Sequence, residues 1–381
     1  MNDFTYYNPT KIEFGKGKEK NIGKYIKDSG YESVLLVYGT GSIKKSSLYD
    51  DTIASLKEAG LKYEELSGIV SNPLISKVRD GIKIAKDNKL QAVLGVGGGS
   101  VADSVKAIAA GAKYDGDVWD FFIQKAVIKE ALPVFTVMTL AATASEMNGN
   151  AVITNELTQQ KFSIGTVLVN PVLSVINPEL MATVSKDYLA YSAVDAIAHT
   201  IEVYFTATEH PKFNSRLVEA IIKTIMETTE ILIKDPNDYE ARGDFAWAAT
   251  QALNGLTTSG THGGNFPNHM IEHTLSALYN VPHGAGLSIV IPAWMKWYKE
   301  QNTAQFERFA KEIFGLSTAD EGINELESWF SKIGSPVTLD QAGISKDDID
   351  KMAENAVQTS KLWGLEENYN EQTIKDILHK A

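Results

Sequence analysis

Most of the seven histidines lie between residues 199 and 283, and several have the spacing of metal ligands. Asp195 and His199 are four residues apart, as are His269 and His273, so each pair shares one face of a helix. His283 follows in a Val-Pro-His-Gly turn. Three imidazole nitrogens and one carboxylate oxygen suit Fe(II) or Zn(II) and leave room for a substrate oxygen. Spacing alone leaves open which of His269 and His273 binds the metal.

The other histidines carry no such pattern. A lone histidine is more often a packed or surface residue than a ligand, so we expect His262 in a loop and His210 and His379 at the surface. The chain has no cysteine, which excludes thiolate ligands, iron–sulfur clusters and cysteine nucleophiles. Any metal must therefore be bound by histidine, carboxylate or water.

A glycine-rich segment follows an apolar run that reads as a strand. Gly97, Gly98, Gly99 and Ser100 stand between this run and a helical stretch. Glycines let a phosphate approach backbone N–H groups, and a helix N-terminus adds partial positive charge. The spacing is not the G-x-G-x-x-G fingerprint, and a tight turn is the alternative. Its place at the carboxyl end of a strand favours a phosphate site.

A second loop, Gly39-Thr40-Gly41-Ser42, ends another apolar run and is followed by Lys44 and Lys45. It contains no carboxylate. An acidic side chain beside the adenine ribose usually binds the 2′-hydroxyl of NAD and repels a 2′-phosphate. Its absence favours NADP(H) over NAD(H), with a solvated turn as the alternative.

The remaining chain indicates which elements position these groups. Apolar runs at residues 33–38, 91–96, 133–138 and 173–176 alternate with helical stretches, which predicts a parallel sheet covered on both faces. After about Pro178 we expect helices, at 187–204, 212–233 and 239–256, and a polar helical segment from 307 to 381. The prediction is an α/β dinucleotide-binding domain over residues 1–180 and an all-α metal-binding and substrate domain over residues 181–381.

Composition and charge restrict the kinds of partner that this chain is expected to bind. The formal net charge is −12 and we find no basic patch with interleaved aromatics, which argues against nucleic acid and anionic membranes. The N-terminus lacks a signal-peptide pattern and no apolar run reaches the roughly 20 residues of a membrane span. We therefore expect a cytoplasmic protein, with a homodimer as the default assembly.

Together these motifs resemble the iron-containing (group III) alcohol dehydrogenases, in particular the butanol dehydrogenase-like branch, nearly end to end. The resemblance includes Pro9 to Gly17, Tyr38 to Lys45, Gly97 to Ser100, Thr139 to Glu146, Trp247 to Gly255 and the histidine cluster. Three positions depart from the family pattern. Ala141 and Ala144 stand where many relatives have Pro and Gly, and Thr40 replaces a common Gly.

The resemblance implies roles for individual residues. The metal ligands would be Asp195, His199, His269 and His283, with His273 unligated as a proton relay near the nicotinamide. Asp195 and His273 are thus the expected catalytic residues. The adenine ribose of the cofactor would be bound by Gly39 and Ser42. The pyrophosphate would be bound by Gly97, Gly98, Gly99 and Ser100, with Asp103 just behind. The cofactor cleft would be lined by Thr139, Thr143 and Lys161.

The expected activity is hydride transfer between NAD(P)H and a small alcohol or aldehyde, such as butanol and butanal, assisted by Fe(II) or Zn(II). One alternative is a lyase of the dehydroquinate synthase type, which needs a basic pocket, whereas the residues around Asp195 are poor in Lys and Arg. A second is polyol oxidation of the glycerol dehydrogenase type. A third is a metal- or nucleotide-binding protein without catalysis.

Overall fold

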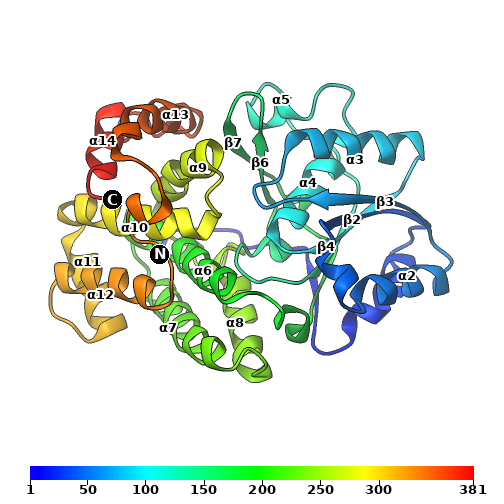
Figure 1. The fold of residues 1–381 in the computed structure, drawn as a ribbon, viewed down its shortest axis with the longest axis horizontal. Helices are drawn as coiled ribbons and strands as arrows, with labels where there is room; N and C mark the ends of the chain where they lie inside the picture. Colours follow the sequence, from blue (N-terminus) through cyan, green and yellow to red (C-terminus); the bar gives the residue numbers. More distant parts are fainter. The chain divides into compact units, whose positions relative to one another are not determined.

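The computed structural model describes residues 1–381, which form two compact units. One comprises Tyr7–Thr183, and the other comprises Met1–Tyr6 with Val184–Ala381. The first contains a parallel sheet with helices and the second is helical, which confirms the predicted fold class (Figure 1). None of the helices is both long and apolar enough to cross a membrane.

The sheet of the α/β unit has six strands in the order β1-β8-β5-β4-β2-β3, and every neighbouring pair is parallel. The strands are β1 (Lys11–Phe14), β2 (Ser33–Gly39), β3 (Lys62–Ile69), β4 (Ala92–Gly97), β5 (Val134–Met138) and β8 (Leu173–Ile176). The four runs predicted from apolar residues correspond to β2, β4, β5 and β8. Strands β1 and β3 escaped prediction, because they are edge strands in which polar residues interrupt the apolar pattern.

Helices cover both faces of this sheet. Residues Ile22 and Ile26 of α1 (Ile22–Asp28) and Leu56 of α2 (Leu48–Glu58) share one apolar cluster with alternate residues of the strands. On the opposite face, a Cβ added at Gly95 of β4 would contact Val105 of α4 (Gly99–Ala112) at 3.2 Å. Helix α4 in turn packs against α3 (Ile75–Asp87). Burial on both faces explains the uninterrupted apolar runs of the central strands.

A small antiparallel hairpin accompanies the sheet. It consists of β6 (Asn150–Asn155) and β7 (Gln160–Gly165), and it was not anticipated from the sequence. Strand β6 packs against α4, and the Thr154 amide donates to the Pro73 carbonyl. The short α5 (Trp119–Phe122) packs against β7.

The second unit is built from helices. Its two long helices, α6 (Lys186–Thr206) and α7 (Lys212–Lys234), match the predicted stretches closely, whereas α8 (Tyr239–Ala252) ends four residues before the expected 256. The remaining helices are α9 (Pro267–Tyr279), α10 (His283–Tyr298), α11 (Thr303–Phe309), α12 (Ala319–Lys332), α13 (Ile349–Leu362) and α14 (Glu371–Leu378). Two very short strands, β9 (Ala207–Glu209) and β10 (His262–Gly263), pair in the same unit, so strands do not stop entirely at Pro178.

The strand order creates a switch point on the sheet. After β2 the chain adds β3 on one side and then crosses to add β4 on the other. Open α/β sheets bind ligands at the carboxyl ends of strands where the order reverses in this way. The loops that begin at Gly39 and Gly97 end the two strands that flank this point.

Candidate functional site

One face of α6 carries three buried polar residues on successive turns. Asp195, His199 and Glu202 are spaced four and three residues apart and are almost inaccessible to solvent. The helix is long enough to present them because Ser185 caps it, its side chain accepting a hydrogen bond from the Tyr188 amide. Such residues are rarely buried unless they bind one another or a ligand.

Helices α9 and α10 bring the other histidines to the same place. Helix α9 ends at Tyr279 and is capped by Asn280, which has a left-handed φ of 54°, and α10 begins directly after Pro282. A Cβ added at Gly284 would lie 2.0 Å from the Tyr191 carbonyl oxygen of α6. The glycine therefore allows the first turn of α10, which begins with His283, to pack closely on α6.

Three imidazole side chains converge on the Asp195 carboxylate. Its Oδ1 lies 3.6 Å from His199 Nδ1, 3.7 Å from His269 Nε2 and 3.6 Å from His283 Nε2. The ligand atoms of Asp195, His199 and His269 all lie within 4.8 Å of one another. The structure thus brings together all four residues that the family resemblance implies as metal ligands.

Two further carboxylates, which the sequence analysis did not identify, orient the imidazoles. Glu202 is fully buried and its Oε1 lies 2.8 Å from His269 Nδ1, while Glu272, equally buried, contacts His283 Nδ1. Each contact turns the Nε2 atom of its histidine toward Asp195. A carboxylate behind a metal-binding histidine commonly fixes ring orientation and tautomer. The sequence could have identified both carboxylates, because Glu202 is one turn beyond His199 and Glu272 lies between His269 and His273.

Charge in the cluster favours ionised ligands. Burial alone would raise the pKa of Asp195, but the nearby His199 and His283 and the contact with His269 hold it well below its usual range. Burial likewise lowers the pKa of His269, whereas its contacts with Asp195 and Glu202 outweigh burial and raise it to about 9. Asp195 is therefore a carboxylate at neutral pH, and a metal ion at this site would have to displace a proton from His269.

The donor set fits a divalent metal. Asp195 Oδ1 and His269 Nε2 are buried without a hydrogen-bond partner, which is costly unless a ligand compensates them. A tetrahedral ion with ligand bonds of about 2.1 Å would place its ligand atoms about 3.4 Å apart. The separations of 3.6–3.7 Å around Asp195 Oδ1 are close to that value.

His273 is buried beside the cluster, one turn after His269. Its ring centre is 5.9 Å from that of His283, and 5.5 Å from that of Trp363, whose plane is inclined at 80°. The structure therefore places His273 next to the proposed ligand His283. Trp363, which directly follows α13 as its C-cap, was not singled out from the sequence.

The glycine-rich segment forms the start of α4. Helix α4 begins at Gly99, directly after β4 and its cap Gly98, and the Thr139 amide after β5 donates to the Gly97 carbonyl. A Cβ added at Gly99 would lie 2.7 Å from the Thr143 methyl carbon. Thr139 and Thr143 thus border the same helix N-terminus, where backbone N–H groups can bind phosphate.

At the end of β2 a cluster of side chains surrounds the Gly39 turn. Glu65 of β3 accepts hydrogen bonds from the hydroxyls of Tyr38 and Tyr49. The Lys44 ammonium lies 5.0 Å from the centre of the Tyr38 ring and 4.4 Å from that of Tyr49. Ser42 is exposed at the start of the turn that follows Gly41. The Glu65 carboxylate near this turn is therefore hydrogen-bonded to two tyrosines, whereas the Lys44 ammonium lies beside the turn.

The two remaining predicted cofactor residues contact protein groups. The Asp103 oxygens accept hydrogen bonds from Ser145 Oγ and from the Val152 amide. Lys161 of β7 is buried and donates to Asn72 Oδ1 at 3.1 Å. Asp103 thus lies one turn into α4 behind the glycines, bound to the 145–152 segment.

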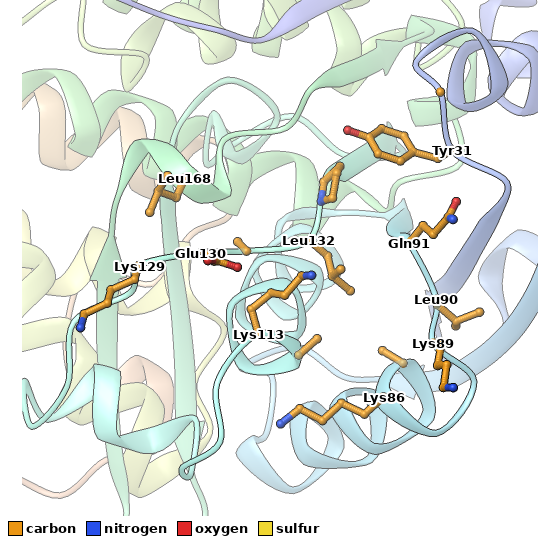
Figure 2. Close-up of a pocket in the computed structure, with 15 residues that line it drawn as sticks. Tyr31, Lys86, Lys89, Leu90, Gln91, Lys113, Lys129, Glu130, Leu132 and Leu168 are labelled. Carbon is orange, nitrogen blue, oxygen red and sulfur yellow. The ribbon is translucent and has the colours of Figure 1, made fainter.

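A hollow of about 900 Å³ lies at the opposite, amino-terminal edge of the sheet (Figure 2). Gln91 and Pro133, which precede β4 and β5, line it together with Lys86, Lys89 and Lys113. These lysines lie at the C-terminal ends of α3 and α4, where cations stabilise the helix dipole. Helix stabilisation is therefore sufficient to explain them.

Comparison with known proteins agrees with this geometry. Residues 9–178 match the iron-containing alcohol dehydrogenase family, and residues 189–381 match the C-terminal part of the Fe-containing alcohol dehydrogenase family. The chain is 40% identical to a probable NADH-dependent butanol dehydrogenase of Bacillus subtilis, over 99% of both chains. It is 33% identical to an NADPH-dependent aldehyde reductase of Escherichia coli, over 90% of both.

A solved structure shares the whole fold. The NADH-dependent butanol dehydrogenase A of Thermotoga maritima superposes with a TM-score of 0.97 at 47% identity, covering 100% of this chain and 99% of that one. The relatives are named for both nicotinamide cofactors, so they leave the predicted NADP(H) preference open. The chain belongs to the iron-containing alcohol dehydrogenase family, in its butanol dehydrogenase-like branch, and is an oxidoreductase of the alcohol dehydrogenase and aldehyde reductase type.

Proposed function

We propose that this enzyme interconverts short aliphatic aldehydes and alcohols, such as butanal and butanol, at a divalent metal held by Asp195, His199, His269 and His283. One observation carries the proposal above all others. Asp195 Oδ1 is surrounded by three imidazole nitrogens at 3.6–3.7 Å yet has no hydrogen-bond partner. Fe(II) and Zn(II) both accept this donor set.

When bound, the metal supplies a Lewis acid for the substrate oxygen, and the nicotinamide dinucleotide supplies or accepts the hydride. The protein's own residues prepare the site for this. Glu202 and Glu272 hold two ligand rings in the required orientation. Burial of the cluster keeps bulk water away from the reacting groups.

His273 is proposed as the proton relay. It lies beside the ligand set rather than within it, and an imidazole titrates near neutrality, so it can exchange a proton with an alcohol oxygen. Trp363 packs edge-on against the His273 ring and supports its position.

The dinucleotide is proposed to bind at the carboxyl edge of the α/β sheet. The pyrophosphate would accept hydrogen bonds from the backbone N–H groups of Gly97, Gly98, Gly99 and Ser100. The site would be lined by Thr139, Thr143 and Lys161. The adenine ribose would lie against Gly39 and Ser42. Two observations support a preference for NADP(H). Glu65 is engaged by two tyrosines, and Lys44 places a positive charge near the ribose loop.

The test is a metal-loading assay. The metal-free protein is loaded anaerobically with Fe(II) or Zn(II), and loss of NADPH absorbance is followed with butanal, with NADH in parallel. We expect metal-dependent turnover that is faster with NADPH. Faster turnover with NADH would overturn only the cofactor preference. No net cofactor turnover with aldehydes, ketones or polyols, despite bound metal and nucleotide, would contradict the proposed chemistry.

The homodimer and the cytoplasmic location remain predictions. Sedimentation velocity would test the first and cell fractionation the second. Neither affects the assignment of the metal or nucleotide residues.

A further inference from the structure

Lys106 is a fully buried lysine that the proposed chemistry does not use. It lies on α4, two turns beyond the glycine segment, and long helical side chains lean toward the helix N-terminus. Its ammonium donates to Ser145 Oγ at 2.7 Å, to the Asn150 carbonyl at 2.8 Å and to Asn148 Oδ1 at 3.2 Å. Three acceptors from one loop around a buried ammonium indicate a specific role for the charge.

Asp103, one turn earlier on α4, holds the same loop. Its Oδ1 accepts the Ser145 hydroxyl at 2.7 Å and its Oδ2 accepts the Val152 amide at 3.0 Å. Ser145 therefore lies between the two charged groups, accepting from Lys106 and donating to Asp103. Through Ser145, Asn150 and Val152, these hydrogen bonds fix the loop and the start of β6 to α4, the helix that begins at the glycine segment.

The network extends to the residue that borders the glycine segment. Asn148, which accepts from Lys106, donates to the Thr143 carbonyl at 3.1 Å, and the Ser145 amide donates to Thr143 Oγ1 at 3.2 Å. Between them, Ala144 adopts a left-handed φ of 49°, which is unfavourable for a residue with a Cβ. Surrounding contacts must stabilise this turn. The Met147 amide donates to the Ala144 carbonyl and the Ser174 hydroxyl donates to the Glu146 carbonyl, and the hydrogen bonds from Lys106 add to these.

We infer that Lys106 is a positioning residue for the dinucleotide, because its ammonium holds the 143–150 loop in the conformation that places Thr143 against Gly99. The inference rests on the proposed nucleotide site at residues 97–100. Loss of the ammonium would remove one hydrogen bond each from Ser145 Oγ, Asn148 Oδ1 and the Asn150 carbonyl. Thr143 would then move relative to the helix N-terminus, and dinucleotide affinity would fall while the metal site stayed intact.

The charges around Lys106 make this role sensitive to pH. Burial lowers the pKa of Lys106 to about 8, although the negative charges of Asp103 on its own helix and Glu146 in the loop act to raise it. Lys161 of β7 in turn acts to lower the pKa of Asp103. Helix α3 presents the apolar Gly81 and Ile82 to α4. Above about pH 8 the ammonium is therefore lost, and the dinucleotide should bind more weakly.

Stability should respond with the opposite sign. Because the pKa of Lys106 is lowered in the folded state, the unfolded chain binds more protons between about pH 8 and the ordinary value of 10.5. This group therefore makes the fold more stable as the pH rises through that interval.

The test is fluorescence titration of the full-length, metal-loaded enzyme with NADPH. Lys106→Met should raise the Kd and the KM for NADPH about tenfold, the effect expected from losing hydrogen bonds to a charged donor, with kcat at saturating NADPH and metal content within about twofold of wild type. Lys113→Met is the matched control, since Lys113 follows the exposed end of the same helix (Figure 2), and it should leave the Kd unchanged. A folded Lys106→Met enzyme with the wild-type Kd would overturn the inference.

Two measurements remain decisive if Lys106→Met does not fold. The Kd of the wild-type enzyme should rise at least about threefold between pH 7 and 9.5, and Ser145→Ala should raise the Kd at pH 7 by a similar factor. A flat pH profile together with a wild-type Kd in Ser145→Ala would contradict the inference. A wild-type enzyme that binds neither NADPH nor NADH would instead overturn the proposed nucleotide site.

Discussion

The histidine cluster and the glycine-rich edge of the sheet differ in the groups that face the proposed ligand and in what orients those groups. In the helical unit the groups that face the ligand are side chains, and each orienting group is another side chain, as with Glu202 behind His269. In the α/β unit the groups proposed to meet phosphate are backbone amides at the start of α4, and a buried polar network holds the adjacent loop.

This difference determines how each region should respond to substitution. A side-chain ligand cannot be replaced by its neighbours, so its loss should remove the bound ion. A backbone site keeps its N–H groups after most substitutions, so single changes there should alter affinity or preference rather than abolish binding.

Removing a proposed ligand should have the largest effect. His269→Ala or His283→Ala should lose the metal and at least about a thousandfold in turnover, equivalent to about 4 kcal/mol of barrier lowering. Metal content is measured by mass spectrometry and turnover by loss of NADPH absorbance. His262→Ala is the control, because His262 is exposed in the short strand β10 and lies outside the cluster; the structure thus places it in a strand, where a loop was expected. Full metal and activity in either ligand variant would show that the assignment is wrong.

Replacing the proposed relay should slow the reaction without affecting the metal. His273→Ala should retain wild-type metal content while turnover falls about 10²- to 10³-fold, since general acid–base groups typically contribute that much. The two readouts are compared on one preparation. Metal loss in this variant would make His273 a ligand and would break the distinction between it and His269.

Removing the charge of an orienting carboxylate should weaken the metal site more moderately. Glu202→Gln and Glu272→Gln each keep the shape of the side chain, and each should lower metal affinity about 10- to 100-fold. Competition with a chelator measures this affinity. Glu227→Gln, at an exposed position of α7, should match wild type. Unchanged affinity in both variants would mean that helix packing alone orients the rings.

The smallest effect is expected in the nucleotide region. A Cβ at Gly39 would meet only the Ile69 carbonyl oxygen, at an acceptable 3.4 Å, so Gly39→Asp should fold normally. Its carboxylate should shift the ratio of kcat/KM values toward NADH by about tenfold, by repelling a 2′-phosphate. Parallel assays with both cofactors test this. An unchanged ratio would place the adenine ribose elsewhere.

Local sequence determined much of this protein. Spacings of four residues place Asp195 with His199, and His269 with His273, on helix faces whatever the rest of the chain does. Uninterrupted apolar runs marked the central strands β2, β4, β5 and β8, because burial on both faces leaves no polar alternation. The glycine segment was recognisable because it follows one of those runs.

Tertiary structure decided what local spacing could not. Spacing in the sequence does not distinguish His269 from His273 as a ligand, whereas the contact of His269 with Glu202 of α6 turns it toward Asp195. The network of Lys106 with Ser145 and Asn148 was equally invisible, because its members are about 40 residues apart and meet only when the 143–150 loop folds onto α4. Contacts between distant segments depend on the assembled fold, whereas periodicity depends on neighbouring residues alone.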